Sequence, residues 1–404
     1  MSTYTDASLI YYPSGYKESK AYSLKPTDGS GDLDFTRAST ATRVNESGLI
    51  ESVATGVPRI DFTGGGCGKL LLEPQRTNLV TQSVDLSSWS FSNWTKTINS
   101  ATAPDGTNTA NLIEQATNGF IYASSATAES TLSIFLKYNS AMQFFQIMGN
   151  GDANTYANFD IVNGLVGNIG SLSKAEIKDY GSGWYRISMT ILTGATLASF
   201  RIKSVTSLTA AWNNGTVFSG SFYAWGAQVE TGYATSYIPT TSTAVTRVGE
   251  NSLSGVLPTI VNDFTFFVDF VRYGQYANSG VYNFAVKNST NTDIISIYKP
   301  SSVGNLNVAY KIGGVTTVAN IGASVGNFVH HKIAFVCNGT TVKVFKDGAL
   351  VDTKTGFLNS DLLTDIHLRT ESVSAANEYG SKFQSILFYL SALTDTELET
   401  LTTL

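Results

Sequence analysis

The chain has 404 residues, of which 42% are hydrophobic and 12% aromatic, enough for two or three domains with cores of their own. Only 14% are charged, against roughly 25% in an average soluble domain, so Ser, Thr, Asn and Gly must cover much of the surface. The net charge of −5 provides no basic footprint, so no nucleic-acid partner is expected.

The sequence contains no membrane or export signal that we recognise. No run of about 18 apolar residues exists, so no membrane insertion is expected. The first six residues lack the basic and apolar regions of a signal peptide, which leaves routes such as assembly into a virus particle. The two cysteines, Cys67 and Cys337, lie far apart and are expected to be unpaired.

Residues 1–80 differ from the rest because continuous apolar runs are short and small polar residues are common. Such a segment cannot close a core alone. We expect it to pack as extended ribbons against a later domain or another subunit.

Residues 81–247 and 248–404 each read as an antiparallel sandwich, because short β-branched and aromatic runs alternate with turn residues. The first unit contains TLSIFLK at 131–137 and WYRISM at 184–189, and the second contains FTFFVDF at 264–270. Asp347-Gly348 predicts a tight hairpin turn. The predicted fold is therefore all-β, with an extended N-terminal segment followed by two jelly-roll-type sandwiches.

One short helix is expected at the C-terminus. Thr394 and Glu397 have capping-box spacing, and Leu398 and Leu401 follow at helical spacing. We expect this helix to lie on the surface and cover one edge of the last sandwich.

Several phrases resemble known proteins. FTRAS at 35–39, ATRVN at 41–45, PRID at 58–61 and LLEPQRTNL at 71–79 resemble the N-terminal module of tailed-phage head-fibre, tail-fibre and spike proteins, frequent in phages of Bacteroidetes. PDGT at 104–107, GWYR at 183–186, WGAQVE at 225–230 and ATSYIPT at 234–240 resemble a carbohydrate-binding-module jelly roll. The last third, with its Asp347-Gly348 hairpin and LTDTEL at 393–398, resembles a laminin-G or concanavalin-A-like sandwich.

The resemblance implies a virion protein, commonly a homotrimer, that attaches to other virion proteins through its N-terminal segment and displays sugar-binding domains to a host-surface glycan. It also allows calcium, since both sandwich families often bind it through Asp, Asn and backbone oxygens. Asp105 and Glu230 are candidate ligands, but turn stabilisation by Asp105 and an edge position for Glu230 are favoured. No other cofactor is expected, and no metal site is assigned.

No catalytic residues are predicted. The three histidines are His330, His331 and His367, and the adjacent pair should point to opposite faces of a strand, so it cannot hold one metal. Neither a metalloprotease, nucleophile-elbow nor phosphate-loop motif occurs. The chain is therefore expected not to be an enzyme. A polysaccharide depolymerase, which needs two suitably spaced carboxylates, is the enzymatic alternative.

Aromatic side chains are the candidate ligand platforms, because a ring can stack on the apolar face of a pyranose. Trp212, beside the turn residues Asn213 and Asn214, is the first candidate. Trp89 and Trp94 could be either platform or core, and Trp184 and Trp225 favour the core. Tyr273 and Tyr276 could form the rim of a ligand site, or could simply pack with their hydroxyls exposed to water.

Arginines and carboxylates recur in the N-terminal segment, and guanidinium forks suit bidentate contacts with carboxylates. We interpret Arg37, Arg43, Arg59, Glu73 and Arg76 as assembly residues between chains, with ordinary surface salt bridges as the alternative. Three functions follow: a receptor- or glycan-binding fibre, a structural decoration or connector protein, and a depolymerase. The first is preferred.

Overall fold

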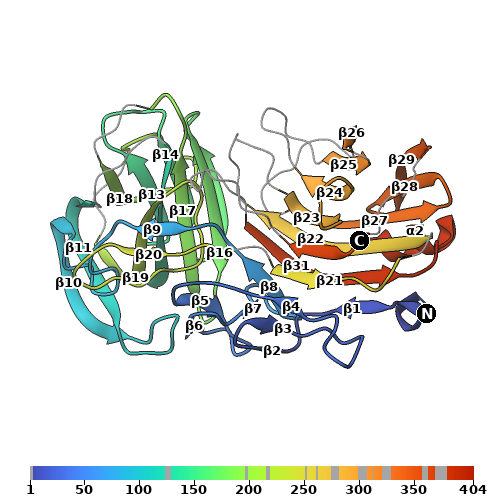
Figure 1. Ribbon diagram of the computed structural model, residues 1–404. Coiled ribbons are helices and arrows are strands. Elements are labelled where there is room, and N and C mark those ends of the chain that lie inside the picture. Colours follow the sequence, from blue (N-terminus) through green and yellow to red (C-terminus); the bar gives the residue numbers. More distant parts are fainter. Residues whose placement is uncertain are drawn as a thin grey trace.

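The computed structural model describes residues 3–122, 129–195, 199–214, 219–250, 253–260, 263–273, 282–298, 307–312, 314–320, 329–356, 363–368 and 380–404. Antiparallel strands form two lobes side by side, and the N-terminal segment runs beneath them (Figure 1). The predicted all-β class is confirmed. Within these ranges no helix has the length and apolar character needed to cross a bilayer.

The first sandwich is a single ten-stranded sheet that bends around one core, since its terminal strands β15 and β16 contact each other. Side chains alternate between core and outer face, so Ile134, Phe145 and Ile187 are fully buried. The strands are β10 (Ser90–Ala101), β11 (Ala110–Tyr122), β12 (Ser130–Ser140), β13 (Phe144–Gly149), β14 (Tyr156–Asp160), β15 (Leu165–Ile169), β16 (Ser173–Asp179), β17 (Trp184–Ile191), β18 (Phe200–Val205) and β19 (Gly220–Thr231).

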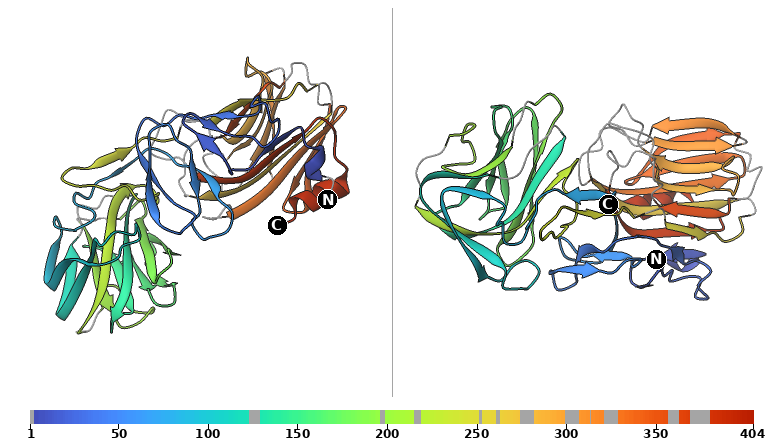
Figure 2. Two further views of the ribbon diagram at one scale, coloured as in Figure 1. Left: turned by 90° about the horizontal axis from the view of Figure 1, so that it is seen from below. Right: turned by 60° about the vertical axis from the view of Figure 1, so that its left-hand side comes forward.

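The second sandwich packs an eight-stranded sheet against a nine-stranded sheet around a Phe-rich core (Figure 2). Asp347 and Gly348 both have positive φ and join β28 to β29, as the sequence predicts. The strands from the C-terminal part of the chain are β21 (Leu253–Val256), β22 (Phe264–Tyr273), β23 (Tyr282–Lys287), β24 (Ile294–Tyr298), β25 (Asn307–Ile312), β26 (Val315–Asn320), β27 (Val329–Asn338), β28 (Thr341–Lys346), β29 (Ala349–Thr355), β30 (Asp365–Leu368) and β31 (Gly380–Tyr389).

The N-terminal segment completes both sheets of the second sandwich. Its elements, with the strand that follows the first sandwich, are β1 (Leu9–Tyr11), β2 (Tyr16–Lys17), β3 (Lys20–Ala21), β4 (Leu33–Asp34), β5 (Ala41–Val44), β6 (Ile50–Val53), β7 (Arg59–Asp61), β8 (Lys69–Leu72), β9 (Arg76–Asn78) and β20 (Val245–Arg247). β1 and β8 both pair with β31, and β4 pairs with β21. Of the two neighbours expected for this segment, the structure shows the later domain.

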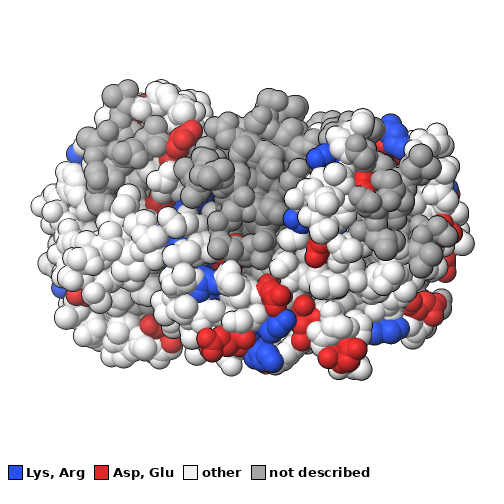
Figure 3. All heavy atoms as spheres, viewed as in Figure 1, with Lys and Arg blue, Asp and Glu red and all other residues white. Residues whose placement is uncertain are grey.

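The same segment also reaches the first sandwich. The β5–β6 hairpin places Val44 and Ile50 against Phe135, Trp184 and Trp225 of that sandwich. The strand β9, which enters the first sandwich, pairs with β20, which leaves it. Charged side chains gather along the lower margin of Figure 3, where the N-terminal segment lies. The segment is therefore the part of the chain that contacts both lobes.

Two helices flank the second sandwich: the single turn α1 (Thr3–Asp6), which the sequence did not predict, and α2 (Asp395–Thr402). Leu398 and Leu401 of α2 pack on the outer face of the eight-stranded sheet near its β29 edge. The N-terminus lies at the same end of the molecule (Figure 2). The helix forms at the expected residues, but it packs on the face of the sheet across β27, β28 and β29 instead of covering only an edge.

Replacing Thr394 with alanine is expected to cost about 1 kcal/mol of unfolding free energy. The Thr394 hydroxyl accepts a hydrogen bond from the Glu397 backbone N–H at 3.4 Å, and the Glu397 carboxylate accepts one from the Thr394 N–H at 2.8 Å. Urea unfolding measures the change. The exposed mid-helix Thr400→Ala is the control and should be close to neutral, because alanine is the better helix former. Equal effects of both substitutions would contradict the capping role.

Candidate functional site

A buried cluster of charges, here called the charged joint, lies where the N-terminal segment meets the chain leaving the first sandwich. It comprises Arg37, Arg59, Glu73, Arg247 and Glu250, whose side chains are at most 2% exposed. One Glu250 oxygen lies 3.2 Å from Arg37 Nη1 and 2.6 Å from Arg59 Nη2. The other accepts the backbone N–H of Glu73 at 2.7 Å. The Glu250 carboxylate thus connects segments of the chain that lie 177 to 213 residues apart.

Glu73 is the second carboxylate of the charged joint. Its Oε2 lies 2.9 Å from Arg59 Nη1 and 2.6 Å from Arg247 Nη1, and Ser236 donates its backbone N–H and its hydroxyl. Burial alone would raise the pKa of Glu73, but the charges of Arg247 and Arg59 outweigh it and hold the pKa far below its usual value. Glu73 is therefore ionised at neutral pH and keeps its guanidinium partners paired.

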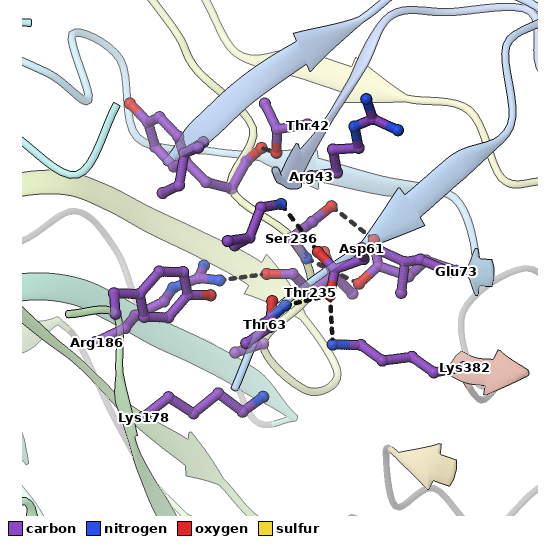
Figure 4. A pocket seen from close by; sticks show the side chains of 16 residues that line it. Thr42, Arg43, Asp61, Thr63, Glu73, Lys178, Arg186, Thr235, Ser236 and Lys382 are labelled. Carbon is purple, nitrogen blue, oxygen red and sulfur yellow. Dashed lines mark hydrogen bonds and ion pairs between the residues drawn. The ribbon is translucent and has the colours of Figure 1, made fainter. Parts of the chain in front are cut away.

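A small polar cavity adjoins the charged joint, between the N-terminal segment, the first sandwich and β31 (Figure 4). Lys382 reaches it from β31 and lies 2.6 Å from Asp61, while Arg186 of β17 donates to the Thr235 carbonyl at 2.6 Å. Its volume is about 40 Å³. A water molecule needs roughly 10–15 Å³ by this measure, so the cavity has room for water but not for a sugar ring.

A larger hollow, here called the tyrosine groove, opens on the N-terminal segment and has a volume of about 640 Å³. That is within the roughly 300–1,000 Å³ of typical small-molecule sites. Strand β31 contributes Gln384, and all the other lining residues come from the segment. The lining residues are Tyr12, Pro13, Ser14, Tyr16, Arg43, Asn45, Glu46, Ser47, Glu51, Ile60, Phe62, Cys67, Gly68 and Gln384.

Polar side chains in the tyrosine groove form an ion pair and hydrogen bonds with one another. Arg43 Nε lies 2.6 Å from Glu51 Oε1, Asn45 Nδ2 donates to Glu51 Oε2 at 3.1 Å, and the Arg43 guanidinium lies 5.3 Å from the Tyr16 ring centroid. Burial raises the pKa of Glu51, but hydrogen bonds from Asn45 and Arg43 outweigh it and lower the pKa overall. The groove therefore combines aromatic rings with a fixed, ionised hydrogen-bond acceptor.

The residues predicted to join chains are arranged differently from that expectation. Arg37, Arg59, Glu73 and Arg76 are at most 4% exposed, and all four have partners in their own chain. Their interpretation as contacts between subunits is corrected, because burial within one chain removes them from its surface. Arg43 remains partly exposed, pairs with Glu51 and lines the tyrosine groove.

The predicted tryptophan platforms divide into core and surface. Trp89 and Trp94, for which platform and core were both open, are 6% and 5% exposed and belong to the core of the first sandwich, so the platform alternative is wrong. Trp184 and Trp225 are buried as expected. Trp212 is half-buried in its turn, with its indole N–H 3.4 Å from the Gly149 carbonyl.

The remaining predicted ligand residues are two tyrosines and two acidic side chains. The side chain of Tyr273, at the end of β22, and the whole of Tyr276 lie outside the described residues. Asp105 accepts hydrogen bonds from the Thr107 N–H and hydroxyl, as a turn residue does. Glu230 is buried and accepts from Thr235. Among the described residues no three His, Cys, Asp or Glu side chains converge as a metal site would require.

Sequence reasoning missed four residues of these two sites. Arg247 and Glu250 complete the charged joint, yet no local pattern links them to Arg37 or Arg59. Tyr12 and Tyr16 of the tyrosine groove stand in a short aromatic stretch, YYPSGY at 11–16, whose Pro-Ser-Gly turn was the available signal.

Comparisons with known proteins found matches only among solved structures. No protein-family model matches the chain, and no curated protein matches it. The carbohydrate-binding module of a Ruminococcus gnavus sialidase bound to α2,3-sialyllactose is 19% identical and covers 36% of this chain and 84% of its own, with a TM-score of 0.29.

Two further matches are of similar strength. A heptameric SAP-like pentraxin from Limulus polyphemus is 16% identical over 37% of this chain and 74% of its own, with a TM-score of 0.30. A structure of botulinum neurotoxin type C is 12% identical over 38% of this chain and 39% of its own, with a TM-score of 0.32. Cell entry of that neurotoxin depends on interaction with two ganglioside molecules. At such TM-scores these similarities carry no argument about function.

Proposed function

We propose that this chain is a non-enzymatic attachment protein of a tailed-phage virion, a fibre or spike that binds a host-surface glycan. The tyrosine groove is the observation that supports glycan binding. The N-terminal phrases that resemble phage fibre proteins support the virion location and a homotrimer that meets other virion proteins.

The lining of the groove suits a saccharide. Tyr12, Tyr16 and Phe62 are half-buried, so part of each ring remains open to a ligand. Glu51, Asn45 and Gln384 supply carboxylate and amide groups for sugar hydroxyls. An apolar wall with a few fixed polar groups is the usual composition of a small-ligand site.

Truncation of Tyr16 to alanine is expected to weaken glycan binding about tenfold, the equivalent of roughly 1.4 kcal/mol. A glycan array probed with the full chain finds the ligand, and isothermal titration measures the difference. Tyr138→Ala is the matched control, because Tyr138 is an exposed tyrosine of the first sandwich outside the groove. An unchanged affinity in Tyr16→Ala, with an unchanged melting temperature, would remove the groove from the site.

A connector role remains the second candidate function, and the charged joint favours it. Buried ion pairs that fix the segment between two sandwiches suit a rigid spacer as well as a receptor-binding tip. If the assembled chain binds no glycan on the array and instead copurifies with virion components, the connector role replaces our proposal. Release of oligosaccharides from host capsule would instead show an enzyme.

A further inference from the structure

Two cations lie on the outer face of the first sandwich, away from the charged joint and the tyrosine groove. Arg201 and Lys203 flank Ile202 in β18, and Ile202 points into the core, so the two cations point to the opposite face. The Arg201 guanidinium lies 5.1 Å from the Phe120 ring centroid and 4.7 Å from that of Tyr122. Lys203 Nζ lies 5.0 Å from the Phe120 ring. We call these four residues the cationic patch.

Neither cation has a carboxylate partner in the described part of the chain. Lys203 is 1% exposed, and the hydrogen bonds of its ammonium go to neutral oxygens, the Asn213 carbonyl at 3.1 Å and side-chain amide at 3.3 Å. Arg201 Nε is buried without a hydrogen-bond partner. Burial lowers the pKa of Lys203, as expected where no anion offsets desolvation.

This arrangement differs from that of the charged joint and its neighbouring cavity. There, Arg59 pairs with two carboxylates and Lys382 with Asp61. A buried charge without a counter-ion is costly, so folds usually pair it or neutralise it. Arg201 is partly exposed, so an anion from outside can reach it, and the buried charge of Lys203 on the same face of β18 adds to the attraction.

Trp212 lies at the margin of the cationic patch. The turn that carries it is fixed by the Asn213 N–H, which donates to Gln146 Oε1 of β13 at 2.9 Å. The Trp212 indole N–H points to the Gly149 carbonyl, and Gly149 pairs with Phe200, the neighbour of Arg201. Lys203 donates to the carbonyl and the side-chain amide of Asn213, so the half-buried Trp212 is carried by the turn that binds this lysine.

We infer that the cationic patch binds the anionic group of an acidic saccharide: Arg201 holds a carboxylate or sulfate, the buried Lys203 adds positive charge without touching the ligand, and Trp212 contacts the sugar ring. The inference rests on the proposed function in that it names the charge of the glycan. It uses a different site, so the two can fail separately. Arginine is suited to either anion through its planar fork.

The test uses three probes titrated into the full chain: a hyaluronan hexasaccharide with carboxylates, a chondroitin sulfate hexasaccharide that adds sulfates, and a neutral chitin hexasaccharide. We expect at least one acidic probe to bind at least tenfold more tightly than the neutral one, with affinity falling as salt rises. The two acidic probes separate carboxylate from sulfate recognition.

Arg201→Gln is expected to reduce this acidic preference about tenfold without lowering the melting temperature, because it breaks no ion pair among the described residues. Lys203→Met should reduce the preference less and should also lower the melting temperature, because it removes the two hydrogen bonds to Asn213. Lys96→Met is the matched control, since Lys96 lies over the Phe91 ring elsewhere on this sandwich. Arg201→Lys should keep most of the preference and shows that charge, not fold, is measured.

Two results would overturn the inference: equal affinity for acidic and neutral probes, or an acidic preference that survives Arg201→Gln. A large fall in the melting temperature of Arg201→Gln, without a change in preference, would assign this cation a structural role and equally overturn the inference. If Tyr16→Ala alone abolishes binding, the proposed function stands and the patch is excluded.

Discussion

Replacing Glu250 with glutamine is expected to lower the unfolding free energy by about 3–5 kcal/mol. The substitution keeps the shape but removes the charge that faces Arg37 and Arg59, both fully buried. Arg37 would then lose its carboxylate partner, and Arg59 would keep only Glu73, which it already shares with Arg247. Urea unfolding followed by tryptophan fluorescence measures the loss.

The matched control is Asp34→Asn. Asp34 also lies 2.6 Å from a cation, Lys20, but its side chain is 64% exposed. Exposed pairs of this kind are worth about 0–1 kcal/mol, so the control should be near neutral. A Glu250→Gln loss no larger than that of the control would mean that the charged joint adds nothing beyond surface pairing.

Acidification is expected to destabilise the fold through Glu73. The folded pKa of Glu73 lies below its ordinary value of 4.5, so its stabilising contribution is fully present above about pH 4.5 and is lost as the pH falls towards the folded pKa. Each proton taken up on unfolding adds about 1.4 kcal/mol per pH unit to the slope. Urea unfolding between pH 7 and pH 3 measures that slope.

Glu73→Gln separates this residue from the other carboxylates. The variant should be less stable at pH 7, yet its stability should fall less steeply below pH 4.5, because one titrating group is gone. Asp61 acts in the same direction: burial raises its pKa, but Lys382 outweighs it and lowers the pKa overall, so some acid sensitivity remains. Identical slopes in the variant and the original chain would show that Glu73 does not titrate as proposed.

Glu250 and Glu73 both belong to the charged joint, which lies where the first sandwich joins the rest of the chain. Because β9 and β20 pair directly beside the charged joint, the chain enters and leaves the first sandwich at one place. A fibre that binds weakly at several sites gains affinity only when those sites keep a fixed geometry. A charged joint that holds the two lobes in a fixed arrangement is thus consistent with the proposed attachment role.

Local patterns in the sequence determined the strand-rich class, the Asp347-Gly348 hairpin and the cap at Thr394. These features depend on residues within a few positions of one another, so alternation and turn chemistry reveal them. The burial of Trp184 and Trp225 followed from the same alternation. The burial of Trp89 and Trp94 could not be predicted in this way, because their neighbours in the sequence are polar. Trp94 lies in β10, which pairs with β11 at one side of the sheet, and Trp89 directly precedes β10.

Only the tertiary structure decided what the arginines of the N-terminal segment do. Local sequence shows that Arg37 and Arg59 need acidic partners, but Glu250 lies 213 and 191 positions further along the chain. Strand pairing that distant is set by the packing of whole sheets, which no local pattern encodes. The same packing makes the segment part of the second sandwich, opens the tyrosine groove on it, and gives Arg201 and Lys203 no carboxylate partner among the residues that the structure describes.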